Sequence, residues 1–236
     1  LQWGDEGKGK IVDFDEKLLL EESNIILLSG GALGGKGRGL AFIHTLIYNF
    51  DVSQYVTGVN IKAPRTFIIG TNEFEDFLDN NDLRDKVYTE PDYEKIKKIF
   101  IGGSLTPALV KKLRAILEKI TKPLAVRSSG LFEDSLMQPF AGIFETYLLP
   151  NTNSDIEIRL AQLMDAIKLV YASIYSDTAR GYISAINYKI EEEKMAVIIQ
   201  ELVGEQHENS YYPHISGVGQ SYNYYPYGHM QPEDGF

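Results

Sequence analysis

The sequence predicts a mixed α/β domain, of the α/β or α+β class. Short apolar runs that suit buried strands alternate with amphipathic segments that suit helices along most of the 236 residues. Apolar residues make up 44% and charged residues 24% of the chain, so disorder throughout is excluded. At roughly 150 residues per domain, the chain is expected to form one or two domains with a substantial core.

Each predicted element depends on a local signal. Thr106 and Pro107 supply an N-cap and a first-position proline for one helix, and Ser154 with Glu157 forms a capping-box pattern for another. Thr71 or Asn72 is expected to cap a short helix. Strands are expected at 10–14, 66–70, 124–128, 143–149 and 195–199, and helices at 38–50, from 71 or 72, at 92–101, at 107–120, from 154 and at 177–187.

Two of these helices show an apolar periodicity. In the helix from residue 154, apolar side chains recur at alternating spacings of four and three, which is typical of a stripe that faces a core. Its members are Ile156, Leu160, Leu163, Ile167, Val170 and Ile174. The helix at 38–50 is expected to carry Leu40, Ile43, Ile47 and Phe50 on one face.

The charge and the residue types exclude several classes of function. With 23 basic and 33 acidic residues the net charge is −10, so nucleic acid is not an expected partner. The chain has no cysteine, which excludes disulfides and thiolate metal sites. No apolar run approaches the roughly 18 residues that span a membrane, and no signal peptide is recognised, so a cytoplasmic protein is expected. The chain opens on Leu1 without an initiator methionine, and we expect it to be a piece of a longer protein.

The segment from Gln2 to Asp13 is rich in glycine and contains two lysines. It resembles the N-terminal signature of adenylosuccinate synthetase, in which a glycine-rich loop binds GTP and an aspartate acts as a base. That resemblance implies GTP and IMP binding at Asp5 and Lys8. The alternative, a solvated turn before a strand, is favoured because the continuation from Phe14 departs from that family and its later motifs are not recognised.

A second glycine-rich segment runs from Gly30 to Leu40. Its spacing fits a Walker A loop up to Lys36, but Gly37 replaces the hydroxyl residue that such a loop places on Mg²⁺, so a P-loop enzyme is disfavoured. Exposed glycine N–H groups, a following helix and the cations Lys36 and Arg38 still favour anion binding. A flexible turn with solvated cations is the alternative.

A third motif places an arginine at the end of an apolar strand. Arg127 follows Ala125 and Val126 and precedes two serines, an arrangement that suits a phosphate clamp. The alternative is an ion pair between Arg127 and Glu133 or Asp134, which follow a few residues later.

Taken in order, the motifs carry a resemblance that no single one carries. They are Gly34-Gly-Lys-Gly-x-Gly-Leu40, Ala125-Val-Arg-Ser-Ser129, Glu133-Asp134, Phe140-Ala-Gly-x-x-Glu-Thr146, Met195-Ala-Val-Ile-Ile-Gln200 and Ser216-Gly-Val218. From about residue 30 to 218 this order resembles the N-terminal nucleotide-binding domain of phosphoenolpyruvate synthase and pyruvate phosphate dikinase, in a divergent bacterial branch of that family.

The resemblance implies an ATP-grasp-like fold of two lobes that hold ATP, with Mg²⁺ bridging the phosphates. In the intact family enzyme, phosphate passes from ATP to a histidine on a swivelling domain and then to pyruvate on a third domain. We therefore expect residues 1–29 to be a lead-in segment, 30–203 the ATP-binding domain, and 204–236 the tyrosine-rich start of a truncated remainder. The chain alone is expected to be inactive, with pyruvate and phosphoenolpyruvate as partners of missing domains.

The resemblance also implies roles for individual residues, carried over by motif. Lys36 would contact phosphate, and Arg127 would clamp the phosphates and act in catalysis. Gly142 and Thr146 would lie on a lid segment over the phosphates. The residues Gln200, Glu201 and Val203 would lie beside adenine. The alternatives are that Gln200 is a polar strand end and Thr146 an ordinary strand residue. The sequence identifies no Mg²⁺ ligand and no oligomeric state.

Two departures from the family pattern leave a second function open. Ile143 stands where the family usually has glutamine, and Gly219-Gln220-Ser221 replaces the usual continuation after Ser216-Gly-Val218. The alternative function is therefore a regulatory, non-catalytic module that keeps the nucleotide-binding fold.

Overall fold

The computed structural model describes residues 10–21, 25–50, 58–131, 142–223 and 225–235. The chain divides into two compact units, at 1–202 and at 203–236. The parts of the sequence motifs at Gln2–Gly9, at Glu133 and Asp134, and at Phe140 and Ala141 lie outside the described residues.

The first unit contains a mixed sheet, which has six strands within the described residues, in the order β1-β2-β3-β6-β4-β5. The strands are β1 (Ile11–Asp13), β2 (Ile25–Ser29), β3 (Thr66–Ile69), β4 (Leu124–Gly130), β5 (Thr146–Leu149) and β6 (Met195–Glu201). The pairs β1–β2 and β2–β3 are parallel, whereas β3–β6, β6–β4 and β4–β5 are antiparallel. The central strands β3 and β6 are buried almost throughout, as expected of strands covered on both faces.

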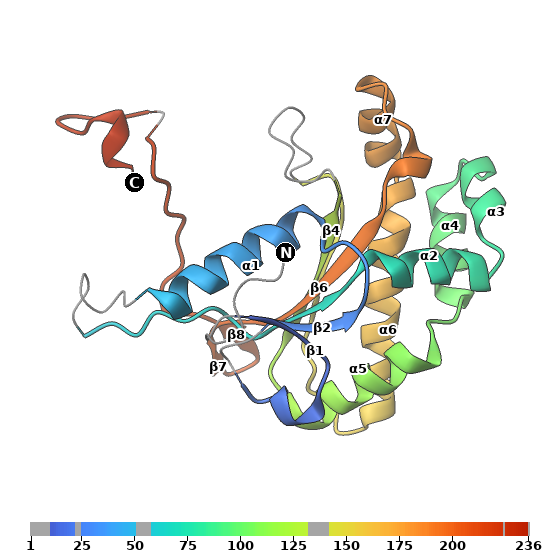
Figure 1. Cartoon of the computed structure of the whole chain (residues 1–236), viewed down its shortest axis with the longest axis horizontal. Coiled ribbons are helices and arrows are strands. Elements are labelled where there is room, and N and C mark those ends of the chain that lie inside the picture. The colour runs from blue at the N-terminus through green and yellow to red at the C-terminus, as the bar shows by residue number, and fades with distance from the viewer. Residues whose placement is uncertain (1–9, 22–24, 51–57, 132–141, 224, 236) are drawn as a thin grey trace. The chain divides into compact units, whose positions relative to one another are not determined.

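Helices lie on both faces of this sheet, with α1 on one and α5 and α6 on the other (Figure 1). The helices are α1 (Gly34–Asn49), α2 (Thr71–Asn80), α3 (Arg84–Thr89), α4 (Tyr93–Gly102), α5 (Pro107–Lys119), α6 (Ile156–Ala172) and α7 (Asp177–Ala185). Short 3₁₀ turns occur at Glu16–Leu18, Ser173–Tyr175, Ile190–Glu192 and Pro232–Asp234.

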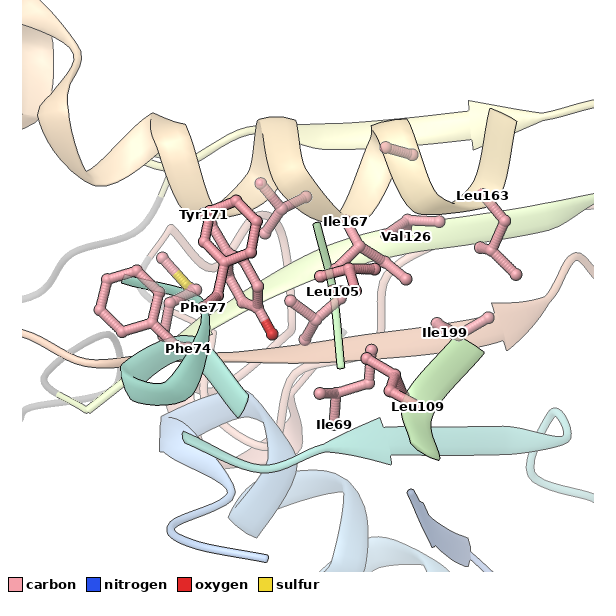
Figure 2. Packing of buried hydrophobic residues seen from close by; sticks show 14 of the residues in the cluster. Ile69, Phe74, Phe77, Leu105, Leu109, Val126, Leu163, Ile167, Tyr171 and Ile199 are labelled. Carbon is pink, nitrogen blue, oxygen red and sulfur yellow. The ribbon is translucent and has the colours of Figure 1, made fainter. Parts of the chain in front are cut away.

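The main core fills the face covered by α5 and α6. Figure 2 shows Leu163, Ile167 and Tyr171 of α6 directed at the strands, with Val126 and Ile199 beneath them. Phe74 and Phe77 of α2 have ring centroids 5.2 and 5.7 Å from that of Tyr171. The stripe predicted for the helix from residue 154 is thus confirmed, since Leu160, Leu163, Ile167, Val170 and Ile174 are buried and Ile156 is partly buried against the same core, although Ile174 lies in the 3₁₀ turn that follows α6.

A much smaller cluster fills the face beneath α1. Ile25, Ile68 and Ile198 are buried there, with Leu33 and Leu40 packed against them. Two of the four residues predicted to share a face of this helix are exposed, Ile43 at 52% and Phe50 at 65%. Since α1 lies on a single face of the sheet, one side of the helix packs against the strands and the other side is exposed to solvent.

Several helix starts differ from the prediction. Helix α1 begins at Gly34 instead of residue 38, because β4 supplies contacts to its first turn. Gly70 is the N-cap of α2, and the Thr71 hydroxyl instead accepts a hydrogen bond from the N–H of Ala32 at 2.9 Å. Asp155 replaces Ser154 as the cap of α6, and its carboxylate accepts from the N–H of Glu157. The caps Thr106 and Pro107 of α5 are confirmed.

The second unit contains a hairpin that the sequence did not predict. Strands β7 (Glu205–His207) and β8 (Ser210–Tyr212) pair antiparallel. Glu208 in the turn has φ +52°, and the His207 ring stacks on the Tyr212 ring with centroids 4.1 Å apart.

Candidate functional site

The glycine-rich loop between β2 and α1 is held by the start of α2. The N–H of Thr71 donates to the carbonyl of Ala32 at 3.1 Å, and the N–H of Asn72 donates to the carbonyl of Gly30 at 3.2 Å. Gly70 lies so close to this loop that an added Cβ would stand 2.3 Å from the carbonyl oxygen of Gly30. The loop is therefore a packed turn, which argues against the alternative of a flexible turn.

The other side of the loop is held by the end of β4. The hydroxyl of Ser129 accepts from the N–H of Gly37 at 2.9 Å and donates to the carbonyl of Leu33 at 2.7 Å. This hydroxyl caps α1, whose own N-cap residue Leu33 makes no side-chain cap. Gly34 has φ +70°, and an added Cβ would lie 1.9 Å from the carbonyl oxygen of Ser129, so only glycine fits.

Lys36 places its charge beside this junction. Its Nζ donates to the hydroxyl of Ser128 at 3.2 Å. The positive end of the α1 dipole and the lysine cation therefore lie at the same end of β4, where both favour an anion.

A row of polar side chains crosses the face of the sheet beneath and beside α1. Nη1 of Arg127 donates to Oε1 of Gln200 at 2.9 Å, and Nε2 of Gln200 donates to the hydroxyl of Thr66 at 3.0 Å. Thr66 in turn donates to the carbonyl of Pro64 at 2.8 Å. Thr146 pairs with Arg127 in register, so its side chain shares this face.

Burial decreases steadily along this polar row. Thr66 and Gln200 are 2% and 5% exposed, Arg127 is half-buried, and Thr146 is exposed. The row therefore leads from under α1 to an exposed edge at strand β5.

The structure brings together some of the predicted residues but not all of them. Lys36, Arg127, Thr146 and Gln200 lie on or beside β4 and its neighbours, and Arg127 stands in the middle of β4 instead of at the predicted strand end, because the strand continues to Gly130. Gly142, an exposed residue with φ +75°, precedes β5 by four positions.

The predicted residues at the end of β6 are differently placed. The carboxylate of Glu201 pairs with Arg65 at 2.9 Å, with both side chains about nine-tenths buried, and its N–H donates to the carbonyl of Arg65 at 3.1 Å. Val203 begins the second unit.

Three residues of the site were not singled out from the sequence. Ser128 and Ser129 follow Arg127 and were noted only as small hydroxyl residues, yet they bind Lys36 and cap α1. Thr66 follows Pro64 at the start of a predicted strand and gave no signal of a polar contact with Gln200.

Two cavities lie near these helices. A narrow one of about 130 Å³ lies under α1, and its walls include Leu40, Ile43, Thr66 and Gln200. A wider and more open one of about 640 Å³ lies between α5, α6 and the turn after α4, and its walls include Leu105, Lys111 and Met164. The narrow cavity adjoins the polar row.

Neither a metal cluster nor a membrane helix is found in the described part of the chain. No group of three His, Asp or Glu residues is placed there to hold a metal ion. No helix there is long and apolar enough to cross a membrane.

The profile of the family described as "Pyruvate phosphate dikinase, AMP/ATP-binding domain" matches residues 31–236. The chain belongs to this family. The resemblance drawn from the ordered motifs is thereby confirmed, and the mixed α/β sheet agrees with the predicted ATP-grasp-like fold class. No curated protein gives a significant match to the chain. As a member of this family, the chain is a nucleotide-binding domain.

Proposed function

We propose that the chain binds ATP with its phosphates between the start of α1 and the end of β4. It does so as the ATP-binding part of a cytoplasmic phosphotransferase similar to phosphoenolpyruvate synthase and pyruvate phosphate dikinase. The observation that carries the proposal is that three consecutive residues of β4 bring these groups to one strand: Arg127 supplies a guanidinium, Ser128 accepts from the Lys36 cation, and Ser129 caps the start of α1. Each of these groups favours negative charge, although the chain as a whole carries −10.

Arg127 is suited to the phosphates by its chemistry and by its support. A guanidinium has five N–H donors in a planar fork that matches phosphate oxygens. Because Nη1 is held by Gln200, and Gln200 by Thr66, the fork is fixed relative to three adjacent strands. Such a preorganised cation can stabilise the charge that develops during phosphoryl transfer.

The nucleotide base is proposed to lie toward the end of β6. The narrow cavity supports this direction because Gln200 lines it together with apolar side chains of α1. The carboxylate of Glu201 is engaged by Arg65, so we assign to Glu201 a contact through its backbone. The lid residues Gly142 and Thr146 keep the roles that the family resemblance implies.

In the intact protein, phosphate would pass from ATP to a histidine on another domain and then to pyruvate. Mg²⁺ is expected to accompany the phosphates, but the described residues around Lys36 and Arg127 are cations, hydroxyls and an amide, which are not the carboxylate ligands that Mg²⁺ prefers. These residues do not fit a protein-held Mg²⁺ site, and the proposal uses no step through the metal.

Isothermal titration of the chain with ATP and Mg²⁺ tests the proposal. We expect Arg127→Ala to weaken ATP binding by about thirtyfold and Lys36→Ala by about tenfold, since each removes a charge-assisted contact with phosphate. Arg114→Ala is the matched control, because Arg114 is a surface arginine paired with Glu157 between α5 and α6. Absence of ATP binding by the wild-type chain contradicts the proposal.

A second candidate is the non-catalytic regulatory module. One observation favours it: Ile143 packs against the main core, where the family usually has a polar residue. ATP affinity that Arg127→Ala leaves unchanged would support this alternative. The Gln2–Asp13 segment lies outside the family match, which begins at residue 31. Thermal stabilisation of the chain by both GTP and IMP would revive the purine ligase alternative.

A further inference from the structure

Glu145 is held by two tyrosines immediately before β5. The hydroxyl of Tyr93 donates to Oε1 of Glu145 at 2.9 Å, and the hydroxyl of Tyr147 donates to Oε2. Tyr93 is the first residue of α4, whereas Tyr147 is the second residue of β5. One carboxylate therefore ties the edge strand of the sheet to a helix on the side of the main core.

The tyrosine hydroxyls are well suited to this contact. Burial raises the pKa of Tyr93, and the neighbouring Glu145 charge raises this pKa further. Burial and a hydrogen bond to Glu145 likewise raise the pKa of Tyr147. Both hydroxyls therefore keep their protons at neutral pH and donate to the carboxylate in charge-assisted hydrogen bonds.

The residue before Glu145 is held as well. Phe144 is 7% exposed and lies against Gly130 at the end of β4, where an added Cβ would stand 2.9 Å from its ring. Gly130 is also close to Glu193, whose Oε1 accepts from the N–H of Leu131 at 2.8 Å. The approach to β5 is thus packed against the strand that carries Arg127.

Thr146 is the residue that these contacts place. It follows Glu145 directly and stands opposite Arg127 in the antiparallel ladder. Side chains alternate across a strand, so Tyr147 faces the core while Thr146 faces the polar row. Contacts on the core side of β5 consequently fix the register and the position of a side chain on the opposite side.

We propose that Glu145 is a positioning residue that, through Tyr93 and Tyr147, holds Thr146 against Arg127 at the phosphate end of the nucleotide site. This inference rests on the proposed function for its ligand, ATP. It assigns to Glu145 no contact with the nucleotide itself, because its two oxygens are directed to tyrosines of the core side.

The first test measures how well β5 is held in the absence of nucleotide. Hydrogen exchange of the amides at 146–149 is compared between the wild-type chain, Tyr93→Phe and Tyr147→Phe. We expect exchange to become about fivefold faster in each variant, since one hydrogen bond to a charged group is lost. Tyr88→Phe is the matched control, because Tyr88 is a half-buried tyrosine whose ring packs against Tyr175, with centroids 6.0 Å apart. Unchanged exchange at 146–149 in both variants overturns the proposal.

The second test compares ATP with AMP, which lacks the two outer phosphates. In Tyr93→Phe we expect the Kd of ATP to rise about fivefold and that of AMP by less than about twofold. Glu145→Gln, which removes the charge that both hydroxyls bind and leaves one acceptor oxygen, should give at least as large a loss. Equal losses for the two nucleotides, or no loss for either, overturn a role at the phosphate end.

The outcomes separate the two proposals. A wild-type chain that binds neither nucleotide contradicts the proposed function, while the exchange measurement still decides whether Glu145 positions β5. A wild-type chain that binds ATP, with variants that bind it equally well, contradicts only the assignment of Glu145.

Discussion

The two faces of the sheet differ in what covers them. The face toward α5 and α6 is closed by a continuous set of aliphatic and aromatic side chains, among them Ile167, Tyr171 and Ile199. The face toward α1 has only a small apolar cluster around Ile198, and beside it the polar row from Thr66 to Thr146 leads to an exposed edge. The same strands therefore serve two purposes, since residues that alternate along them face either the core or the polar row.

The two faces therefore differ in their main contribution: the α5–α6 face contributes mostly to stability, and the α1 face carries the proposed binding groups. Apolar side chains on the α5–α6 face contribute most of the hydrophobic free energy, because more apolar surface is buried there. Groups on the α1 face are fixed by hydrogen bonds and backbone packing instead, which orients cations and hydroxyls without burying them fully.

The sharpest comparison uses two neighbouring residues of β6. Ile199 and Ile198 are both fully buried but belong to opposite faces. We expect Ile199→Ala to lower the free energy of unfolding by about 4 kcal/mol and Ile198→Ala by about 2.5 kcal/mol. Ile199 belongs to the larger apolar cluster, so its truncation should leave a larger cavity than truncation of Ile198 in the small cluster beneath α1. Urea denaturation monitored by circular dichroism measures both. An equal loss for the two variants would mean that the two faces contribute alike.

A backbone substitution at Gly34 tests the packing of α1 against β4. Gly34→Ala forces a side chain into a position with φ +70° and against the carbonyl of Ser129, so we expect a loss of about 3 kcal/mol.

Gly39 in the same helix is the matched control for Gly34→Ala. An added Cβ at Gly39 meets nothing within 4 Å, and Gly39→Ala should raise stability by about 0.7 kcal/mol. Thermal unfolding of both variants checks the pair. If the two substitutions changed stability in the same direction, the close approach of Gly34 to β4 would not constrain the fold.

Ser129→Ala removes the hydroxyl that caps α1 from β4. We expect a loss of about 1 kcal/mol, typical of a lost cap, because the N–H of Gly37 and the carbonyl of Leu33 both lose their partner. Hydrogen exchange of the first-turn amides of α1 should become faster while that of α6 does not change. Equal acceleration in both helices would indicate general destabilisation instead.

The smallest effect concerns Glu73 on the α5–α6 side. Burial raises the pKa of this carboxyl, although it accepts hydrogen bonds from the N–H and the hydroxyl of Thr106. A raised folded-state pKa means that the stability contribution is full below the ordinary pKa of about 4.5 and is lost as the pH rises through the folded value.

Glu73→Gln tests this pH dependence. Its stability relative to the wild type should increase as the pH rises from about 4 to 7, because the glutamine does not ionise. Urea denaturation at several pH values measures the difference. A difference that is constant with pH would show that Glu73 ionises as readily in the folded chain as in the unfolded one.

Elements with strong local signals could be predicted from the sequence. The apolar stripe of α6, the Thr106 cap of α5 and the apolar run of β6 follow from short-range patterns, and all three are found. Strand β2 was missed although Ile25 begins an apolar run, because four residues do not distinguish a strand from other buried structure. The six-residue helix α3 was also missed, since so short a segment carries little periodicity.

The candidate site could be predicted only in part. The motifs placed Lys36 near a helix start and Arg127 on a strand, although Arg127 lies in the middle of β4 and not at its end, and the family match supports the nucleotide-binding role of the domain. The contacts of Ser129 with the start of α1, and of Gln200 with Arg127 and Thr66, join residues more than 70 positions apart. No local pattern specifies such pairs, because they depend on the order of strands in the sheet.

The cap that Ser129 provides to α1 has a consequence for the order of folding. The first turn of α1 contains Gly34, Gly35 and Gly37, which disfavour a helix, and its cap comes from a residue 92 positions beyond Gly37. The chain between Gly37 and Ser129 must close into a long loop before the cap can stabilise α1, so the isolated helix is expected to be unstable. We therefore expect α1 to acquire its structure late, after β4 has joined the sheet, and to protect its amides later than α6 in pulsed hydrogen exchange during refolding.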